Sequence, residues 1–210
     1  MQHSHRLLDA LRDRRLAAHL ASARPAWLWS ADGRTLLWAN AAGAAALSAG
    51  DMAAGTIYVP PQAVVGQIAR LNATLKFDAP PRLARLRGFG TGFGRPLLCA
   101  CSRLSIVDRE AILIAAAEPA GPVLPFLERV RRVLPADETP AAAFAPNGAL
   151  VHANTAAAAR LGHAQTLAAL GVEREAQSAL ASGEVACTIA GRPAQLAGIG
   201  AADPGKLRRT

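Results

Sequence analysis

The chain has 210 residues, enough for one large domain or two small ones, and 51% of them are hydrophobic although only 4% are aromatic. The formal net charge of +8 comes almost entirely from scattered arginines, because Lys76 and Lys206 are the only lysines, and such a charge by itself establishes no nucleic-acid function. No apolar run approaches the roughly 18 residues that span a bilayer, and no apolar stretch of an export signal follows the basic N-terminus, so we expect a cytoplasmic protein.

An amphipathic helix is expected near the start of the chain, over residues 5–22. Its leucines fall on one side and its arginines on the other, and Pro25 ends it. Such a helix either pairs with its twin in a homodimer or packs back on its own domain, and the sequence leaves both open. We assign residues 1–24 to this element.

A hairpin signature follows at residues 30–40, which read SADGRTLLWAN. Trp27 and Trp29 are two residues apart, so they lie on one face of the strand that precedes the turn. Asp32 and Gly33 then turn the chain, because glycine adopts a positive φ without steric cost. The pattern predicts two antiparallel strands.

Helices should come after this hairpin. Asn40 suits a helix N-cap, since its side-chain oxygen can accept a hydrogen bond from an unpaired backbone N–H, and the alanine-rich residues 41–47 continue the helix. Prolines at 60–61 break the region that follows. The longest helix is expected at residues 62–75.

Three strands are then predicted at residues 82–89, 97–107 and 111–117. The last of them is uniformly apolar, as expected for a fully buried strand. Two strands, helices and three more antiparallel strands describe an α+β domain, which we place at residues 25–118.

A linker is expected at residues 119–140, because its first residues are rich in proline and glycine. Within it, residues 123–134 form a second amphipathic helix, which ends at Pro135. This helix should connect two domains.

The hairpin signature recurs at residues 145–154, which read APNGALVHAN, and it opens a second domain at residues 141–200. An alanine-rich helix again follows its asparagine, at residues 155–161. The first copy has one residue more between the glycine and the asparagine, which predicts a small bulge in its hairpin. The second copy should have strands at residues 142–145, 150–153, 184–189 and 194–199. Its last strand is missing, because the tail at 201–210 is polar and broken by proline and glycine, so this copy is incomplete or borrows a strand.

The order of elements and the repeated asparagine resemble the PAS domain, a five-stranded antiparallel sheet with helices across one face that serves as a sensory and dimerisation module. The resemblance implies tandem PAS-like domains of the α+β class, the second possibly truncated. It rests on Asp32, Gly33, Asn40 and Leu47 in the first copy, and on Asn147, Gly148, Asn154, Leu161 and Gly162 in the second.

Residues 25–33, 37–43 and 85–90 are similar to the N-terminal region of PAS-containing sensor histidine kinases of alphaproteobacteria. The resemblance implies a regulatory module of a two-component system, acting through a homodimer and contacts with signalling proteins. The chain shows neither a phosphoacceptor histidine motif nor an ATP-binding pattern. The parent protein would be a kinase, whereas this chain would not phosphorylate anything by itself.

The glycine-rich run at residues 87–95 invites two other interpretations, a phosphate-binding loop and an RNA-binding strand. Its glycines alternate and a strand follows it, which does not fit a dinucleotide fingerprint. Arginine patches with this loop nevertheless keep a nucleic-acid binder as the alternative function. The aromatic residues that could contact a ligand or partner are Trp27, Trp29, Phe89 and Phe93.

A small-ligand sensor is the third possibility, and no cofactor is expected. Cys99 and Cys101 share a strand face and, with three cysteines in total, are expected to be reduced core residues without a metal. His152 and His163 are single histidines, so we expect them at surface or helix-end positions and not as haem ligands. No pattern of catalytic residues is visible.

Overall fold

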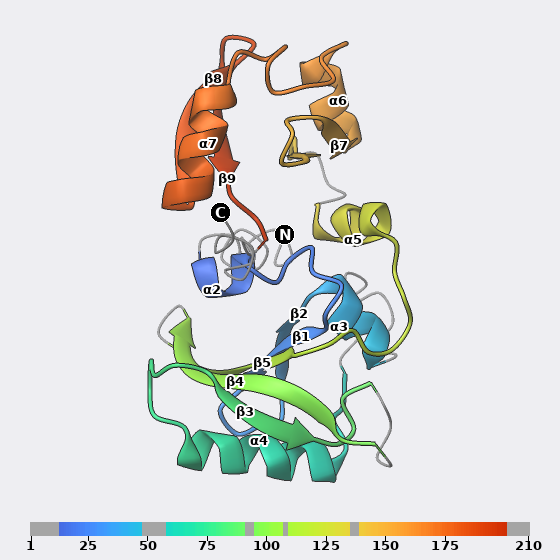
Figure 1. Ribbon diagram of the computed structural model, residues 1–210, viewed down its shortest axis with the longest axis vertical. Helices are drawn as coiled ribbons and strands as arrows, with labels where there is room; N and C mark the ends of the chain where they lie inside the picture. The colour runs from blue at the N-terminus through green and yellow to red at the C-terminus, as the bar shows by residue number, and fades with distance from the viewer. Residues whose placement is uncertain (1–12, 48–57, 91–94, 107–108, 135–138, 201–210) are drawn as a thin grey trace, which may run out of the picture. The chain divides into compact units, whose positions relative to one another are not determined.

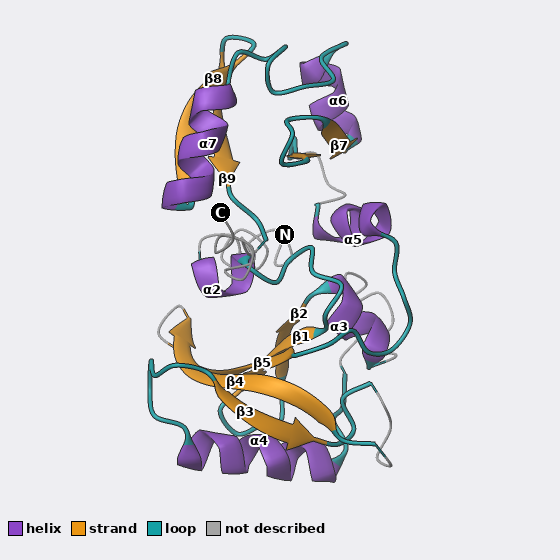
Figure 2. Ribbon diagram, in the orientation of Figure 1, coloured by secondary structure: helices purple, strands orange, loops and turns teal. Residues whose placement is uncertain are grey.

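The computed structural model of the chain describes residues 13–47, 58–90, 95–106, 109–134 and 139–200. The chain divides into two compact units. We call Ser22–Leu124 the sheet unit, and Met1–Ala21 with Pro125–Thr210 the split unit. Helices and strands occur in both (Figures 1 and 2), which confirms the predicted α+β class.

The sheet unit contains one antiparallel sheet of five strands in the order β2-β1-β5-β4-β3. The β5 strand is central, because it pairs with β1 on one edge and with β4 on the other. Its residues from Ala111 to Ala116 are all buried, as the apolar run predicted. The strands are β1 (Ala26–Ser30), β2 (Leu36–Ala39), β3 (Arg82–Leu86), β4 (Leu97–Ile106) and β5 (Arg109–Ala116).

Two helices accompany this sheet, α3 (Ala41–Ala46) and α4 (Gln62–Thr74). The longer one, α4, lies along the sheet (Figure 1) and contacts β4 and β5. It buries Val64, Ile68 and Leu71, whose spacing of three and four residues places them on one helical face. These side chains meet the sheet in a core that also holds Trp27, Trp29, Leu36, Leu75, Leu86, Phe89, Leu97, Cys99, Cys101, Ile112, Ile114 and Ala116.

The split unit carries the second hairpin signature. Its elements are α2 (Arg14–Ala17), α5 (Phe126–Val133), β6 (Ala142–Phe144), β7 (Leu150–Ala153), α6 (Thr155–Leu161), α7 (Glu173–Ser182), β8 (Glu184–Ile189) and β9 (Arg192–Ala197). Residues 1–12, which include the first part of the predicted helix at 5–22, lie outside the described residues. In the described part, α2 begins after its N-cap Asp13 and ends at Ala17, shorter than predicted, because turns follow it.

The second copy has four strands near the four predicted positions, and β9 (Arg192–Ala197) begins two residues earlier than predicted. Within the described residues it forms two separate two-stranded sheets, β6–β7 and β8–β9. In the sheet unit β5 alone joins the corresponding hairpins.

The predicted bulge is present in the first hairpin, but the extra residue does not cause it. The strand register shifts between Leu28 and Trp29 in the first hairpin and between Ala143 and Phe144 in the second, so both copies have the irregularity at the same place. The extra residue of the first copy lies in its turn instead. Ser30 N–H donates to the Thr35 carbonyl at 2.9 Å across residues 31–34, whereas Ala145 N–H donates to the Ala149 carbonyl at 2.8 Å across residues 146–148.

Candidate functional site

Asn40 joins the first hairpin to α3. Its Oδ1 accepts from Gly43 N–H at 2.7 Å, as a helix N-cap, and also from Ala26 N–H at 3.0 Å on β1. Its Nδ2 donates to the Arg24 carbonyl at 2.9 Å. Asn40 is 2% exposed, the only polar side chain among the buried residues described. The side-chain amide of Asn40 therefore connects the start of β1 to the start of α3.

Asn154 makes the same three bonds in the second copy. Its Oδ1 accepts from Ala157 N–H at 2.9 Å and from Ala141 N–H at 3.1 Å, and its Nδ2 donates to the Thr139 carbonyl at 2.7 Å. The two asparagines also share an extended backbone, with φ −73° and ψ 170° in one and φ −72° and ψ 170° in the other. The repeated asparagine thus marks a repeated piece of three-dimensional structure.

The acidic or amide residue of each turn also has a matching role. Asp32 Oδ1 accepts from Arg34 N–H at 3.0 Å, and Asn147 Oδ1 accepts from Ala149 N–H at 3.1 Å. Asp32 Oδ1 accepts in addition from the Ser30 hydroxyl at 2.6 Å. This hydroxyl and the Arg34 N–H lower the pKa of Asp32. The carboxylate therefore stabilises the turn.

The aromatic residues gather inside the sheet unit, between the sheet and its helices. Trp27, Trp29 and Phe89 are all 0% exposed. Phe89 lies edge-on to both indoles, with ring centroids 5.3 Å from Trp27 and 6.2 Å from Trp29. Tyr58, which we did not single out from the sequence, completes the cluster at 6.0 Å from Trp29, and burial raises the pKa of Tyr58. Phe93 lies outside the described residues.

The two indole N–H groups of this cluster differ. Trp27 Nε1 donates to the Gly43 carbonyl at 2.9 Å, which fixes the ring against α3. Trp29 Nε1 is buried and has no acceptor among the described residues. A buried donor without an acceptor costs about 1–3 kcal/mol. The Trp29 Nε1–H is therefore the donor in this core to which a ligand or a water could offer an acceptor. The sequence shows no sign of this difference between the two residues.

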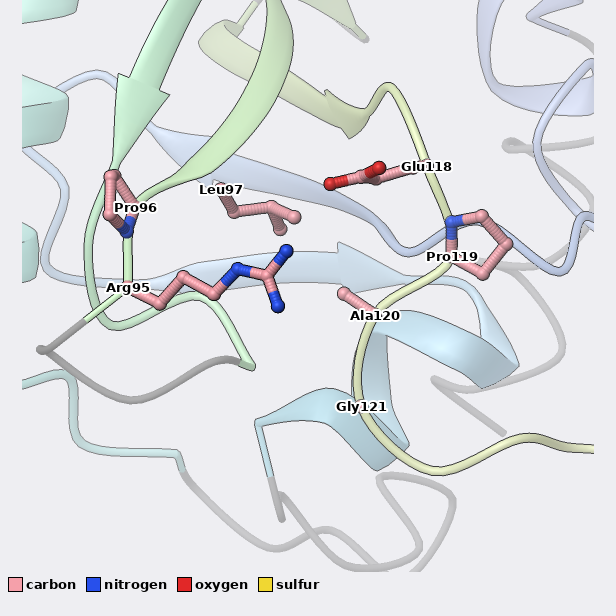
Figure 3. Close-up of a pocket in the computed structure, with 7 residues that line it drawn as sticks. All are labelled: Arg95, Pro96, Leu97, Glu118, Pro119, Ala120 and Gly121. Carbon is pink, nitrogen blue, oxygen red and sulfur yellow. The ribbon is translucent and has the colours of Figure 1, made fainter.

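A surface hollow of about 320 Å³ lies where β4 begins and the chain leaves β5 (Figure 3). Arg95 and Glu118 extend their side chains into the same hollow, over Leu97 and Ala120. The described lining of this hollow offers no hydroxyl, thiol or imidazole that could act as a nucleophile.

The cysteines and histidines do not form a site. Cys99 and Cys101 are 0% exposed on β4, and burial raises their pKa values to about 12 and about 11, so neither is a reactive thiolate near neutral pH. His152 lies on β7 and His163 follows α6. No three His, Cys, Asp or Glu side chains within the described ranges are grouped to hold a metal ion.

Comparison with known proteins finds no match to a family model, to a curated protein or to a solved structure. Among the described helices, none is both long and apolar enough to cross a membrane. The internal comparison of the two copies is therefore the main guide to function.

Proposed function

We propose that this chain is a sensory and dimerisation module of the PAS type, the regulatory N-terminal part of a two-component sensor histidine kinase. The observation that carries the proposal is the duplicated corner at Asn40 and Asn154, where hairpin and helix are joined by the same three hydrogen bonds. The antiparallel sheet with α4 along it supports the same proposal, since such a fold is what the resemblance implies.

The surface of α5 supports contact with another protein chain. Val130 and Val133 are buried, whereas Phe126 is 48% and Leu127 is 40% exposed at the other end of the helix. Apolar side chains at adjacent exposed positions favour burial in an interface. In the proposed mechanism, a signal shifts the population between two arrangements of α2 and α5.

Light scattering on the full chain tests this function. We expect a mass near twice the 21.7 kDa of one chain at high micromolar concentration. Leu127→Glu should weaken self-association about tenfold, because it places a charge in the interface. Leu180→Glu is the matched control, since Leu180 is also exposed, at 62%, and lies on α7. A strict monomer, or equal effects of both substitutions, contradicts the proposal.

A second function, binding of a small ligand inside the sheet unit, is favoured by one observation, the unsatisfied Trp29 Nε1. Native mass spectrometry of the purified chain tests it. A co-purifying molecule that is lost in Trp29→Phe, while the variant keeps its fold by circular dichroism, supports ligand binding. A spectrum of the bare polypeptide alone contradicts it.

A further inference from the structure

Residues 13–21, which we call the N-terminal segment, belong to the split unit, although the sheet unit follows them directly in the sequence. The segment consists of α2 and the turns after it. Leu16 and Leu20, both in this segment, are each 1% exposed. Because it is held among elements that lie far away in the sequence, the segment can connect them.

The first half of the N-terminal segment is bonded to the second copy at two places. Arg14 Nη2 donates to the Ala181 carbonyl at 3.3 Å, in the last turn of α7. A cation is favourable there, because the last carbonyls of a helix lack partners within it and carry its negative dipole end. Gly200 N–H, which follows β9, donates to the Ala17 carbonyl at 3.0 Å. The segment therefore follows the position of α7 and of the chain that leaves β9.

The end of the N-terminal segment is bonded to α5. Arg129 Nε donates to the Ala21 carbonyl at 2.9 Å, although these residues are 108 positions apart. The same guanidinium lies over the ring of Phe126, 5.6 Å from its centroid. Phe126 and Leu127 are the exposed apolar residues of α5. One side chain, that of Arg129, thus contacts both the N-terminal segment and the apolar surface of α5.

The hydrogen bond to Ala21 affects how well Arg129 can hold the Phe126 ring. An arginine side chain has many rotamers, and a bond at its guanidinium removes much of this freedom. Less entropy is then lost when the fixed guanidinium lies over an aromatic ring, where the cation–π attraction is favourable. A side chain that is already ordered also loses less entropy when it enters an interface. The Arg129–Ala21 bond therefore favours association through Phe126.

We propose that Arg129 is a positioning residue through which the N-terminal segment, and with it the second copy, controls association through α5. While the segment is in place, Arg129 holds the Phe126 ring ready for contact with another molecule of this chain. When a change in the second copy detaches the segment, Arg129 loses the Ala21 carbonyl and association weakens. This inference rests on the proposed dimerisation and names the contact that regulates it.

Amide exchange of the full chain, followed by NMR, tests the contact independently of association. The N–H groups of residues 16–20 and of Gly200 donate to carbonyls of the N-terminal segment, so their exchange reports whether it is in place. Arg129→Met should speed this exchange about fivefold, because it removes one hydrogen bond that holds the segment. The Gly198 N–H, which donates to the Gly183 carbonyl, should exchange as before.

Arg131→Met is the matched control for this experiment. Arg131 is exposed on the same helix, so its replacement removes the same charge from α5. It should leave the exchange of residues 16–20 and Gly200 unchanged. Equal exchange in Arg129→Met and in the unaltered chain, or equal acceleration in both variants, overturns the proposal.

Light scattering on the same variants tests the regulation. Arg129→Met should weaken self-association about threefold, as expected for the loss of one exposed cation–π contact. Unchanged association in Arg129→Met, together with weakened association in Leu127→Glu, overturns this inference and leaves the proposed dimerisation intact. A chain that is monomeric throughout overturns both.

A double-mutant cycle tests whether the second copy acts through Arg129. Arg14→Met removes the bond to the Ala181 carbonyl, far from the apolar surface of α5 in the sequence. It should weaken self-association about twofold in the unaltered chain and have no further effect beside Arg129→Met, because the contact that transmits its effect is already gone. Additive effects of the two substitutions overturn the proposed coupling.

Discussion

At the scale of single residues, the asparagine that ends each hairpin contributes most to the local structure. An N-cap needs only an acceptor, which serine, threonine or aspartate also supplies. The Nδ2 group of Asn40 also donates to the Arg24 carbonyl, so one side chain holds both the segment before β1 and the start of α3. This double use explains why an amide stands at both positions.

Asn40→Ala should lower the free energy of unfolding of the sheet unit by about 3 kcal/mol, because it removes a cap and leaves buried N–H groups without an acceptor. Asn154→Ala should cost about 1 kcal/mol, since its surroundings are more exposed. Urea denaturation followed by tryptophan fluorescence measures the first effect, because all three tryptophans, Trp27, Trp29 and Trp38, lie in the sheet unit. An equal shift of this transition in Asn154→Ala contradicts the prediction.

At the scale of elements, the first turn is also part of the packing of α4. Gly33 has a φ of +73°, and a Cβ added there would lie 2.8 Å from Ile68 Cβ. Gly148 has a φ of +81° in the second turn, but its added Cβ would meet nothing closer than Leu167 Cβ at 3.7 Å. The two glycines therefore share a backbone requirement and differ in their neighbours.

Gly33→Ala should destabilise the sheet unit by about 3 kcal/mol, the sum of a strained left-handed backbone and overpacking against Ile68. Gly148→Ala should cost only about 1 kcal/mol, for the backbone alone. Urea denaturation followed by circular dichroism measures both, and fluorescence reports the sheet unit. Equal losses would show that contact with Ile68 contributes nothing.

At the scale of the whole molecule, β5 decides how complete each copy is. It joins two hairpins into one sheet, and the core beneath it buries Cys99 and Cys101 beside Ile112 and Ile114. This burial makes the stability of the sheet unit depend on pH, because each thiol must stay protonated to remain in the core.

Burial raises the pKa of Cys99 to about 12 and that of Cys101 to about 11, from the ordinary 9.0. Above pH 9 the unfolded chain loses these protons first, so the folded state binds more protons and the free energy of unfolding falls as the pH rises. At pH 10 the loss should be on the order of 1 kcal/mol for each thiol. Urea denaturation between pH 8 and pH 10 measures how the free energy of unfolding changes with pH. This range spans the ordinary pKa of 9.0, above which the unfolded chain loses the thiol protons first. The double variant Cys99→Ala with Cys101→Ala should lose this part of the slope, and an unchanged slope contradicts the prediction.

The sequence alone determined the local structure of this chain. The Asx-Gly turns, the asparagine caps, the extent of α4 and the buried run of β5 are all set by neighbouring residues, and each was predicted close to where it lies. Pattern and backbone preference act over a few residues, so they can be read without knowing the fold.

Only the tertiary structure decided how these pieces combine. The place of the extra residue near Gly33, the unsatisfied Trp29 Nε1 and the role of Tyr58 depend on side chains that meet across the core. The separation of β6–β7 from β8–β9 likewise depends on pairing between strands far apart in the sequence. Such contacts arise from long-range packing and register, which leave no periodic pattern along the chain.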